Sequence, residues 1–385
     1  MVDLKGQYLK IKEEIDGAVA GVLDSCSFIN GKQVDDFAQH LAEFTGAKYV
    51  VPCANGTDAL QIALMALMHK SASGRPVLEP GDEVIVPAFT YVATAEVIGL
   101  LGLVPVMVDV DYNTFNIDLE DLEALDRAVS EKTKAIVPVH LFGQCVDMEP
   151  LMTFAKKHNL YVIEDVAQAI GAKYTFSDGR VMQAATIGDI GCTSFFPSKN
   201  LGCYGDGGAL FTNDEHLAAL LKMIANHGQK VKYKHSVIGC NSRLDTIQAA
   251  ILDVKLKYLN DYSASRQMAA AYYTQAFEQW DKEQNFIVTP AQVANSTHVY
   301  HQYTLKVLSD KRDALKEFLN EAGIPAMIYY PLPLQEQEAF KPISRVGTCL
   351  NVSRDLAYSV LSLPMHTELT REQQDVVIAA VKRFF

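Results

Sequence analysis

Short apolar segments alternate with segments of helical periodicity through the first half of the chain. Four apolar segments rich in Val and Ile are candidate strands: residues 83–86, 104–108, 135–139 and 160–164. Each is followed by a loop and a helical stretch. This order predicts a mostly parallel sheet with helices on both faces and right-handed crossovers.

Longer helical patterns occupy both ends of the chain. Residues 11–45 predict amphipathic helices broken near a turn at 27–31, residues 58–68 predict another helix, and residues 243–279 lack a strong breaker. Further on, a strand is predicted at 303–307, a helix at 311–322 and a final helix from Arg371. We therefore predict an α/β protein with a large domain (1–245) and a smaller α+β domain (246–385). Residues 71–80, rich in Ser, Gly and Pro, predict a surface loop.

The composition excludes several classes of protein. With 385 residues, 49% hydrophobic and 21% charged, the chain is typical of globular proteins, and its net charge of -12 argues against binding nucleic acid or an anionic membrane. The start of the chain lacks an apolar signal core, and the longest apolar runs are too short to span a bilayer. Seven irregularly spaced cysteines with no C-x-x-C pair favour free thiols in the cytoplasm over disulfides or a metal site.

Lys199 has an unusual local sequence, between the apolar run 193–197 and the glycine-rich turn 205–208. Burial lowers the pKa of a lysine and makes its neutral amine available as a nucleophile. Glycines let the backbone fold closely around a bound group. These conditions suit a lysine that forms a Schiff base, although most lysines lie on solvated surfaces.

Asp165 follows the apolar strand predicted at 160–164, and Gln168 comes three residues later. Ligands of α/β sheets bind beyond the carboxyl ends of the strands. A carboxylate there can pair with the protonated pyridine nitrogen of pyridoxal phosphate (PLP) and keep the ring electron-poor. The alternative is that Asp165 caps the next helix.

A turn of small polar residues at 53–57 precedes the helix predicted at 58–68. Free amides at a helix N-terminus bind phosphate well, but simple helix capping predicts the same residue types. In combination the signals are more specific. A phosphate seat, the aromatic Tyr91, an acid at a strand end and a lysine before a glycine-rich turn describe a PLP pocket in chain order.

The chain resembles the sugar aminotransferases of the DegT/DnrJ/EryC1 family over nearly its whole length. The residues that carry the resemblance are Asn-Gly-Thr-Asp-Ala-Leu at 55–60, and the blocks 87–94, 164–168, 194–199, 205–208 and 241–245. The resemblance implies the aspartate aminotransferase (fold type I) architecture, with residues 1–245 as the PLP-binding domain. Related dehydratases have a histidine in place of the lysine, so Lys199 favours amino transfer.

The resemblance also implies a role for each matching residue. Lys199 would bond to the cofactor, Asp165 would pair with its pyridine nitrogen, and Gln168 would lie by its phenolic oxygen. The remaining cofactor contacts would be the backbone of Gly56 and Thr57 and the hydroxyl of Ser194 at the phosphate, with Tyr91 stacked on the ring.

The resemblance also implies a homodimer with shared active sites and roles for two further residues. Asn241 would reach the partner's pocket and complete the phosphate or substrate site. Arg243, beside it, would meet the anionic part of the substrate.

The expected reaction is amino transfer, with glutamate as the donor, to C3 of a UDP-linked 2-acetamido-3-keto-hexuronate for surface polysaccharide such as O-antigen. The alternatives are a 3-keto or 4-keto 6-deoxy nucleotide sugar, or a PLP-binding regulatory protein. Tyr329 and Tyr330 are expected to contact the sugar, and Tyr329 stands where relatives usually have a histidine. The basic cluster at 230–235 could attract a nucleotide diphosphate or form a solvated loop. His227 and His301 are expected to be structural or surface residues.

Overall fold

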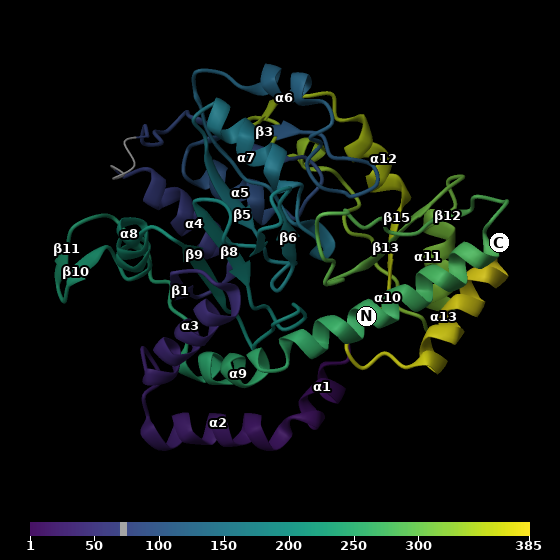
Figure 1. Ribbon diagram of the computed structural model, residues 1–385, viewed down its shortest axis with the longest axis horizontal. Helices are drawn as coiled ribbons and strands as arrows, with labels where there is room; N and C mark the ends of the chain where they lie inside the picture. Colours follow the sequence, from purple (N-terminus) through teal and green to yellow (C-terminus); the bar gives the residue numbers. More distant parts are fainter. Residues whose placement is uncertain (70–74) are drawn as a thin grey trace.

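A mixed eight-stranded sheet lies at the centre of the computed structural model, which describes residues 1–69 and 75–385 (Figure 1). Across the sheet the strands are β1 (Tyr49–Cys53), β9 (Gly208–Thr212), β8 (Ile190–Ser194), β5 (Tyr161–Asp165), β4 (Thr133–Ile136), β2 (Glu83–Pro87), β3 (Val104–Val108) and β14 (Arg345–Val346). Of these eight strands, β9 alone runs opposite to the other seven, so its pairings with β1 and β8 are antiparallel and all the others are parallel. The predicted mostly parallel sheet is confirmed. Part of the predicted loop at 71–80, residues 70–74, lies outside the described residues.

Alternation along the strands gives the sheet two apolar faces, as in β2. Val84 and Val86 pack with one core and Ile85 with the other. One face is covered by α4 (Gly56–Leu67), α5 (Ala93–Leu100) and α8 (Glu215–Ala225). The other is covered by α3 (Lys32–Thr45), α6 (Leu122–Ala128), α7 (Met148–Lys157) and α9 (Thr246–Leu256). Helices on both faces are what the alternating pattern predicted.

The N-terminal helices lie outside this sandwich. α1 (Leu4–Lys10) and α2 (Lys12–Ser25) precede α3, and α2 packs on α9 along the lower edge of the molecule in Figure 1. Cys26 adopts a left-handed conformation and ends α2, which is the predicted break before residues 27–31. None of the helices described in residues 1–69 and 75–385 is long and apolar enough to cross a membrane.

The C-terminal part is built around α10 (Leu259–Trp280), the long helix that runs to the right in Figure 1. It packs with α11 (Arg312–Glu321), α13 (Arg371–Phe384) and a three-stranded antiparallel sheet of β12 (Ile287–Val288), β13 (Tyr303–Val307) and β15 (Val360–Leu363). The smaller elements are α12 (Asn351–Ser359), the hairpins β6 (Lys173–Thr175) with β7 (Val181–Gln183) and β10 (Gln229–Val231) with β11 (Lys234–His235), and the 3-10 turns Leu141–Gly143 and Leu334–Glu336.

The C-terminal half also contributes to the large sheet. Strand β14 pairs in parallel with β3, and Arg345 makes two hydrogen bonds of 2.8 Å to the carboxylate of Glu83 on β2. α9, which follows the predicted boundary at residue 245, packs on α2 and α3 of the N-terminal half. The division into domains 1–245 and 246–385 stays a prediction.

Candidate active site

The carboxyl ends of five strands surround a cavity of about 490 Å³. Segments that follow β1, β2, β4, β5 and β8 line it, together with residues from the C-terminal half. The lining includes nine of the predicted site residues: Gly56, Thr57, Tyr91, Asp165, Gln168, Ser194, Lys199, Tyr329 and Tyr330. The fold therefore brings together residues as far apart in sequence as Asn55 and Tyr330, at the edge of the sheet where α/β proteins bind ligands.

One end of the cavity is the N-terminus of α4. Asn55 begins this helix two residues earlier than predicted, because its side chain accepts a hydrogen bond of 2.8 Å from the amide of Asp58. The amides of Gly56 and Thr57 have no acceptor within the helix and carry its positive dipole end. A Cβ on Gly56 would come 2.6 Å from the Cβ of Ser194, so glycine allows the helix to approach β8 closely.

Asp165 is the last residue of β5 and is 7% exposed. Thr94 donates to one carboxylate oxygen at 2.9 Å, and the amide of Ala167 donates to the other at 3.1 Å. Burial raises the pKa of Asp165, while these hydrogen bonds and the charge of Lys199 oppose the rise. The residues after Asp165 form turns up to β6, so the alternative role as a helix cap is wrong.

Lys199 follows β8 on the cavity wall. Burial lowers its pKa to about 8, and the charge of Asp165 opposes this shift. A larger fraction of its amine is therefore neutral near pH 8 than in an ordinary lysine. Asp165 and Lys199, the two groups expected at opposite ends of the pyridine ring of PLP, thus line the same cavity.

Aromatic side chains form another part of the wall. The ring of Tyr91, which is 55% exposed, lies 6.1 Å from that of Tyr330. The hydroxyl of Tyr330 accepts a hydrogen bond of 3.1 Å from Gln168, whose carbonyl oxygen accepts one of 2.8 Å from the amide of Phe142. Hydrogen bonds thus fix both the nitrogen and the oxygen of the Gln168 amide. Burial raises the pKa of the Tyr330 hydroxyl. Tyr329 and Tyr330 line the cavity from the C-terminal half, and their contact with the sugar stays a prediction.

Among the wall residues that the sequence did not point to are His301 and Gln302, which lie outside every block that carries the resemblance. His301 was expected to be structural or at the surface, yet it lines the cavity and is 6% exposed. Its hydrogen bond to Asn200, the neighbour of Lys199, joins segments a hundred residues apart. No local pattern in the sequence indicates this contact. His227, by contrast, lies at the surface.

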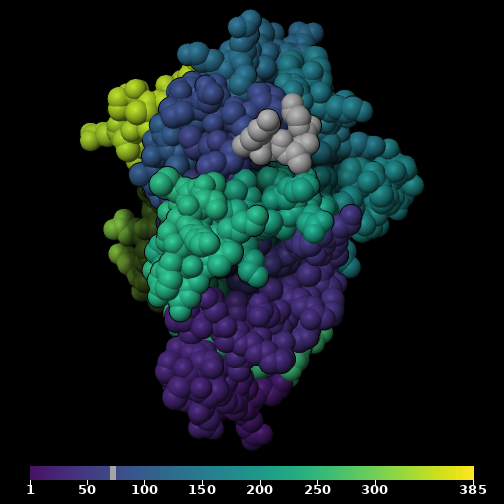
Figure 2. All heavy atoms as spheres, turned by 90° about the vertical axis from the view of Figure 1, so that its left-hand side faces the viewer, coloured from purple at the N-terminus to yellow at the C-terminus, as the bar shows by residue number. Residues whose placement is uncertain are grey.

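Asn241 and Arg243 lie outside the cavity within this chain. Arg243 lines a separate hollow of about 290 Å³ with Asn30 and Lys222, and Asn241 is exposed beside Asn226. The predicted basic cluster at 230–235 lies in the exposed β10–β11 hairpin. Figure 2 shows the segment around this hairpin (green) above the N-terminal helices (purple) on one face of the molecule. The role of Asn241 across a homodimer and the role of Arg243 at the substrate therefore stay predictions.

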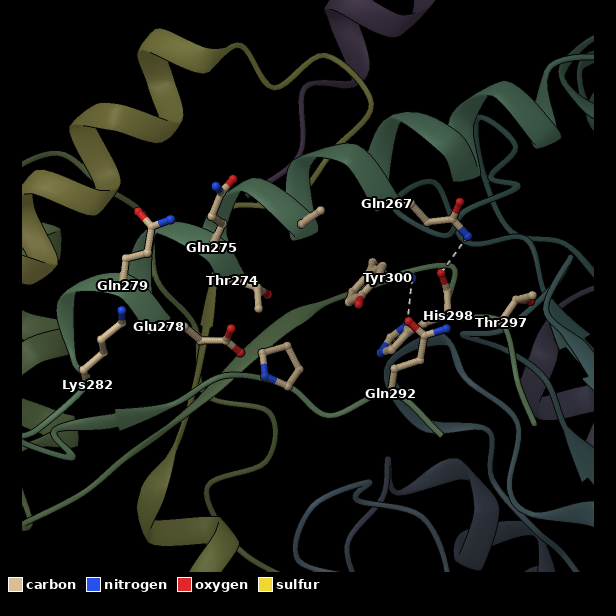
Figure 3. A pocket seen from close by; sticks show the side chains of 12 residues that line it. Gln267, Thr274, Gln275, Glu278, Gln279, Lys282, Gln292, Thr297, His298 and Tyr300 are labelled. Carbon is tan, nitrogen blue, oxygen red and sulfur yellow. Dashed lines mark hydrogen bonds between the residues drawn. The ribbon is translucent and has the colours of Figure 1, made fainter. Parts of the chain in front are cut away.

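A second large hollow, of about 800 Å³, lies between α10 and residues 290–300 (Figure 3). We call it the α10 hollow. Its wall is mainly amide and hydroxyl side chains, including Gln267, Thr274 and Gln292. It is larger than the Lys199 cavity, but the acid and the lysine that line it, Glu278 and Lys282, are exposed and do not follow a strand of the large sheet. We therefore assign the chemistry to the Lys199 cavity.

The Lys199 cavity fits PLP on its own geometry. Glycine at position 56 leaves a cradle at the helix N-terminus that a Cβ would fill. The hydroxyl of Thr90 is buried in the wall and finds no partner within the described residues. A buried acid and a lysine with a lowered pKa supply the two groups that PLP needs.

Comparisons with known proteins agree with this geometry. A Pseudomonas aeruginosa UDP-2-acetamido-2-deoxy-3-oxo-D-glucuronate aminotransferase is 44% identical, covering 99% of this chain and 98% of the relative. A Geobacillus stearothermophilus protein described as a pleiotropic regulatory protein is 46% identical, covering 100% and 98%.

Solved structures show the same architecture. A DegT DnrJ EryC1 StrS aminotransferase from Brucella abortus matches with a TM-score of 0.90 at 39% identity, covering 100% of this chain and 98% of that one. A Bacillus subtilis structure with bound cofactor PMP matches with a TM-score of 0.85 at 32% identity, covering 97% and 82%. The predicted fold type I architecture and PLP cofactor are confirmed. Since the family model matches residues 9–382, the chain belongs to the DegT/DnrJ/EryC1/StrS aminotransferase family.

Proposed function

We propose that this protein transfers an amino group from glutamate to C3 of a UDP-linked 2-acetamido-3-keto-hexuronate. The observation that carries the aminotransferase part is the placement of Lys199 and Asp165 in one cavity next to the N-terminus of α4. The sugar is proposed because the Pseudomonas relative, matched over 99% of this chain, is named for that substrate. The product would serve surface polysaccharide, for example O-antigen.

The protein's own residues have distinct tasks in this chemistry. When bound, PLP would supply an electron sink for the electron pair left behind as a proton leaves the donor's Cα. Lys199 would hold the cofactor, and its amine, once free, would carry a proton between the donor's Cα and the cofactor's C4′. Asp165, with both oxygens fixed by Thr94 and Ala167, would pair with the pyridine nitrogen and favour its protonated form.

Phosphate binding follows from the helix terminus. The amides of Gly56 and Thr57 and the hydroxyl of Ser194 would hold the phosphate, and Tyr91 would cover the ring face. Gln168 would meet the phenolic oxygen while Tyr330 fixes its amide. These assignments place every polar end of the cofactor against a group that can hydrogen-bond to it.

The substrate site is proposed to form between two copies of the chain in the cytoplasm, where its seven unpaired thiols would stay reduced. The cavity mouth carries exposed aromatic side chains, Tyr91 and Phe196, which are 55% and 51% exposed. Arg243 offers a planar fork suited to a carboxylate or phosphate, but it lines another hollow in its own chain. A partner subunit would bring Asn241 and Arg243 to this mouth.

The proposal is tested by spectroscopy and labelling. Glutamate alone should convert the bound cofactor to pyridoxamine phosphate, and borohydride should fix the untreated cofactor on Lys199 in a peptide map. Lys199→Ala should abolish both results. A label on another lysine would contradict the site, and absence of conversion would favour the regulatory alternative suggested by the name of the Geobacillus relative.

The sugar is tested with a panel of keto-sugar nucleotides and mass spectrometry of the products. Arg243→Ala should weaken use of the uronate far more than use of neutral 6-deoxy sugars, because only the uronate offers a sugar carboxylate. If the wild type aminates only neutral 3-keto or 4-keto sugars, the uronate assignment is wrong and the aminotransferase assignment stands.

A further inference from the structure

His301 stands in the wall of the Lys199 cavity, two residues before β13. The mechanism above gives it no task, although its imidazole is one of the few buried titratable groups in the wall. The others facing Lys199 are Asp165 on β5 and Tyr330, while Asp206, Tyr91 and Tyr329 are more exposed.

Hydrogen bonds indicate which nitrogen of His301 carries the proton. The amide nitrogen of Asn200 donates to the carbonyl of Val299 at 2.9 Å. The amide oxygen of Asn200 therefore faces Nδ1 of His301, 3.1 Å away. Because this oxygen can only accept, Nδ1 donates, and Nε2 keeps its lone pair. Gln302 lies 3.5 Å from Nε2 through its amide nitrogen, a donor that agrees with this tautomer.

Arg266 of α10 holds the backbone of the same segment. Its Nη1 donates to the carbonyls of Tyr300 at 3.0 Å, His301 at 3.3 Å and Met365 at 3.3 Å. Burial, followed by the charges of Lys199 and Arg266, keeps the pKa of His301 well below its ordinary value. The imidazole is thus neutral, and its position is fixed from both the backbone and the ring.

We propose that His301 is a positioning residue for Lys199: its Nδ1–H fixes Asn200 and thereby the direction in which the neighbouring Lys199 amine enters the cavity. This inference rests on the proposed function, because direction matters when Lys199 moves a proton. A displacement of about 1 Å in such a group can cost about 100-fold in rate.

His298 offers a matched control, since it is also buried but belongs to the α10 hollow (Figure 3). Its Nδ1 accepts from the amide of Tyr300 at 3.0 Å, and its ring stacks on that of Tyr300 with centroids 3.8 Å apart. It thus has the opposite tautomer and a different neighbour. His298→Leu should leave Lys199 unchanged.

The test compares His301→Leu with His301→Asn, which have similar shapes. Asparagine places an N–H where Nδ1 lay, whereas leucine does not. In the apoprotein, the pH dependence of labelling of Lys199 by an amine-reactive reagent should have its midpoint near the pKa of about 8. Because His301 is neutral, removing it subtracts no charge, so a shifted midpoint reports a displaced amine. We expect His301→Leu to raise the midpoint towards 10.5 and His301→Asn to retain it.

The holoenzyme provides a second measurement. His301→Leu should slow conversion of the cofactor by glutamate about 100-fold, and His301→Asn should restore most of the rate. Asn200→Leu should reproduce the loss, and the double variant should lose no more, because the two residues act through one hydrogen bond. If His301→Leu fails to fold, Asn200→Leu decides the question by the same two readouts.

The outcomes separate the inference from the proposed function. A wild type that glutamate does not convert contradicts the function, while the apoprotein labelling still reports on His301. A wild-type midpoint and rate in His301→Leu, or an equal shift in His298→Leu, overturns the positioning role.

Discussion

At the scale of single residues, the cavity places two ionisable groups, Asp165 and Lys199, in surroundings that disfavour their charged forms. Burial raises the pKa of Asp165 and lowers that of Lys199, so the protein disfavours the charged form of both. A cationic ring nitrogen next to Asp165 would reverse the first effect, since an opposite charge at contact distance favours the carboxylate. Burying the Asp165 carboxylate without a cation at contact distance is unfavourable in the apoprotein. Pairing with the cofactor relieves this cost, and the relief favours binding of the cofactor.

Asp165→Asn should separate charge from shape. The amide keeps an acceptor for Ala167 or Thr94 and nearly the same volume, so the melting temperature should change little. The rate of cofactor conversion by glutamate should fall by about 100-fold to 1,000-fold, because the nitrogen loses its electrostatic partner. Stopped-flow spectra and thermal unfolding measure the two effects, and a near-normal rate would leave Asp165 a purely structural role.

Lys199 should also link stability to pH in the apoprotein. Its pKa is about 8 when folded and 10.5 ordinarily, so between these values the unfolded state binds more protons and stability rises with pH. Below pH 8 the full cost of burying the charge remains. Lys199→Met should therefore be the more stable protein at pH 7, by about 3 kcal/mol at most, with the advantage shrinking towards pH 10.5. Urea unfolding across this range measures it, and a less stable variant at pH 7 would contradict it.

The role of a cavity residue could be predicted where its flanking sequence carries the signal. The sequence that flanks each residue was enough to indicate Lys199, Asp165 and the turn at Gly56. For His301 it was not, because the environment of His301 is made by Asn200 and Arg266 from distant segments. A histidine in an apolar strand pattern is indistinguishable from an ordinary core residue until the fold brings those partners together.

At the scale of elements, the N-terminus of α4 depends on its fit against β8. Gly56→Ala should push the helix away from Ser194, since the added Cβ would come 2.6 Å from the Cβ of that residue. We expect PLP affinity to weaken at least about 10-fold, because the phosphate loses well-placed amides, each charge-assisted bond being worth about 1.5–3 kcal/mol. Fluorescence titration with PLP measures the affinity.

Gly17→Ala is the matched control for that substitution. Gly17 lies in α2, and a Cβ there would meet no atom within 4 Å. Alanine should therefore stabilise the helix by about 0.5–1 kcal/mol and leave PLP affinity unchanged. Equal loss of affinity in both variants would show that the effect of Gly56→Ala is not local.

Elements with strong β-branched patterns, β2 and β3, were predictable from the sequence. β8 and β9 were not, because they read IGCTS and GALFT and are rich in small residues that suit close packing beside a ligand. β4 begins two residues earlier than predicted and β5 extends to Asp165. Strand ends depend on pairing with neighbours, which local sequence does not contain.

At the scale of the whole molecule, the shared-site homodimer makes a prediction about mixtures. Lys199→Ala and Asn241→Ala proteins should each be inactive. After subunit exchange, about half of the dimers are hybrids with one intact site of two, so about a quarter of wild-type activity should return. Activity assays with exchange confirmed by mass tags measure this, and lack of recovery would place Asn241 outside the partner's site.

The oligomer and the sugar are the parts that the chain alone could not predict. Arg243 and Asn241 are recognisable in sequence, but their surroundings in a single copy do not include the cavity. Which sugar oxygen or carboxylate they meet depends on a surface contributed by another molecule. Periodicity and composition describe one chain and carry no signal for that contact.

The pairing of β14 with β3 has a consequence for synthesis on the ribosome. The edge of the large sheet at β3 is completed by Arg345 and Val346, which are synthesised long after β3 itself. Until these residues emerge, a nascent chain that has already formed β2 and β3 presents an unpaired strand edge to the cell. Arg345 then locks this edge by bonding to Glu83, 262 positions earlier. Emergence of residues 345–346 therefore closes a vulnerable surface, and chaperone protection is most needed just before it.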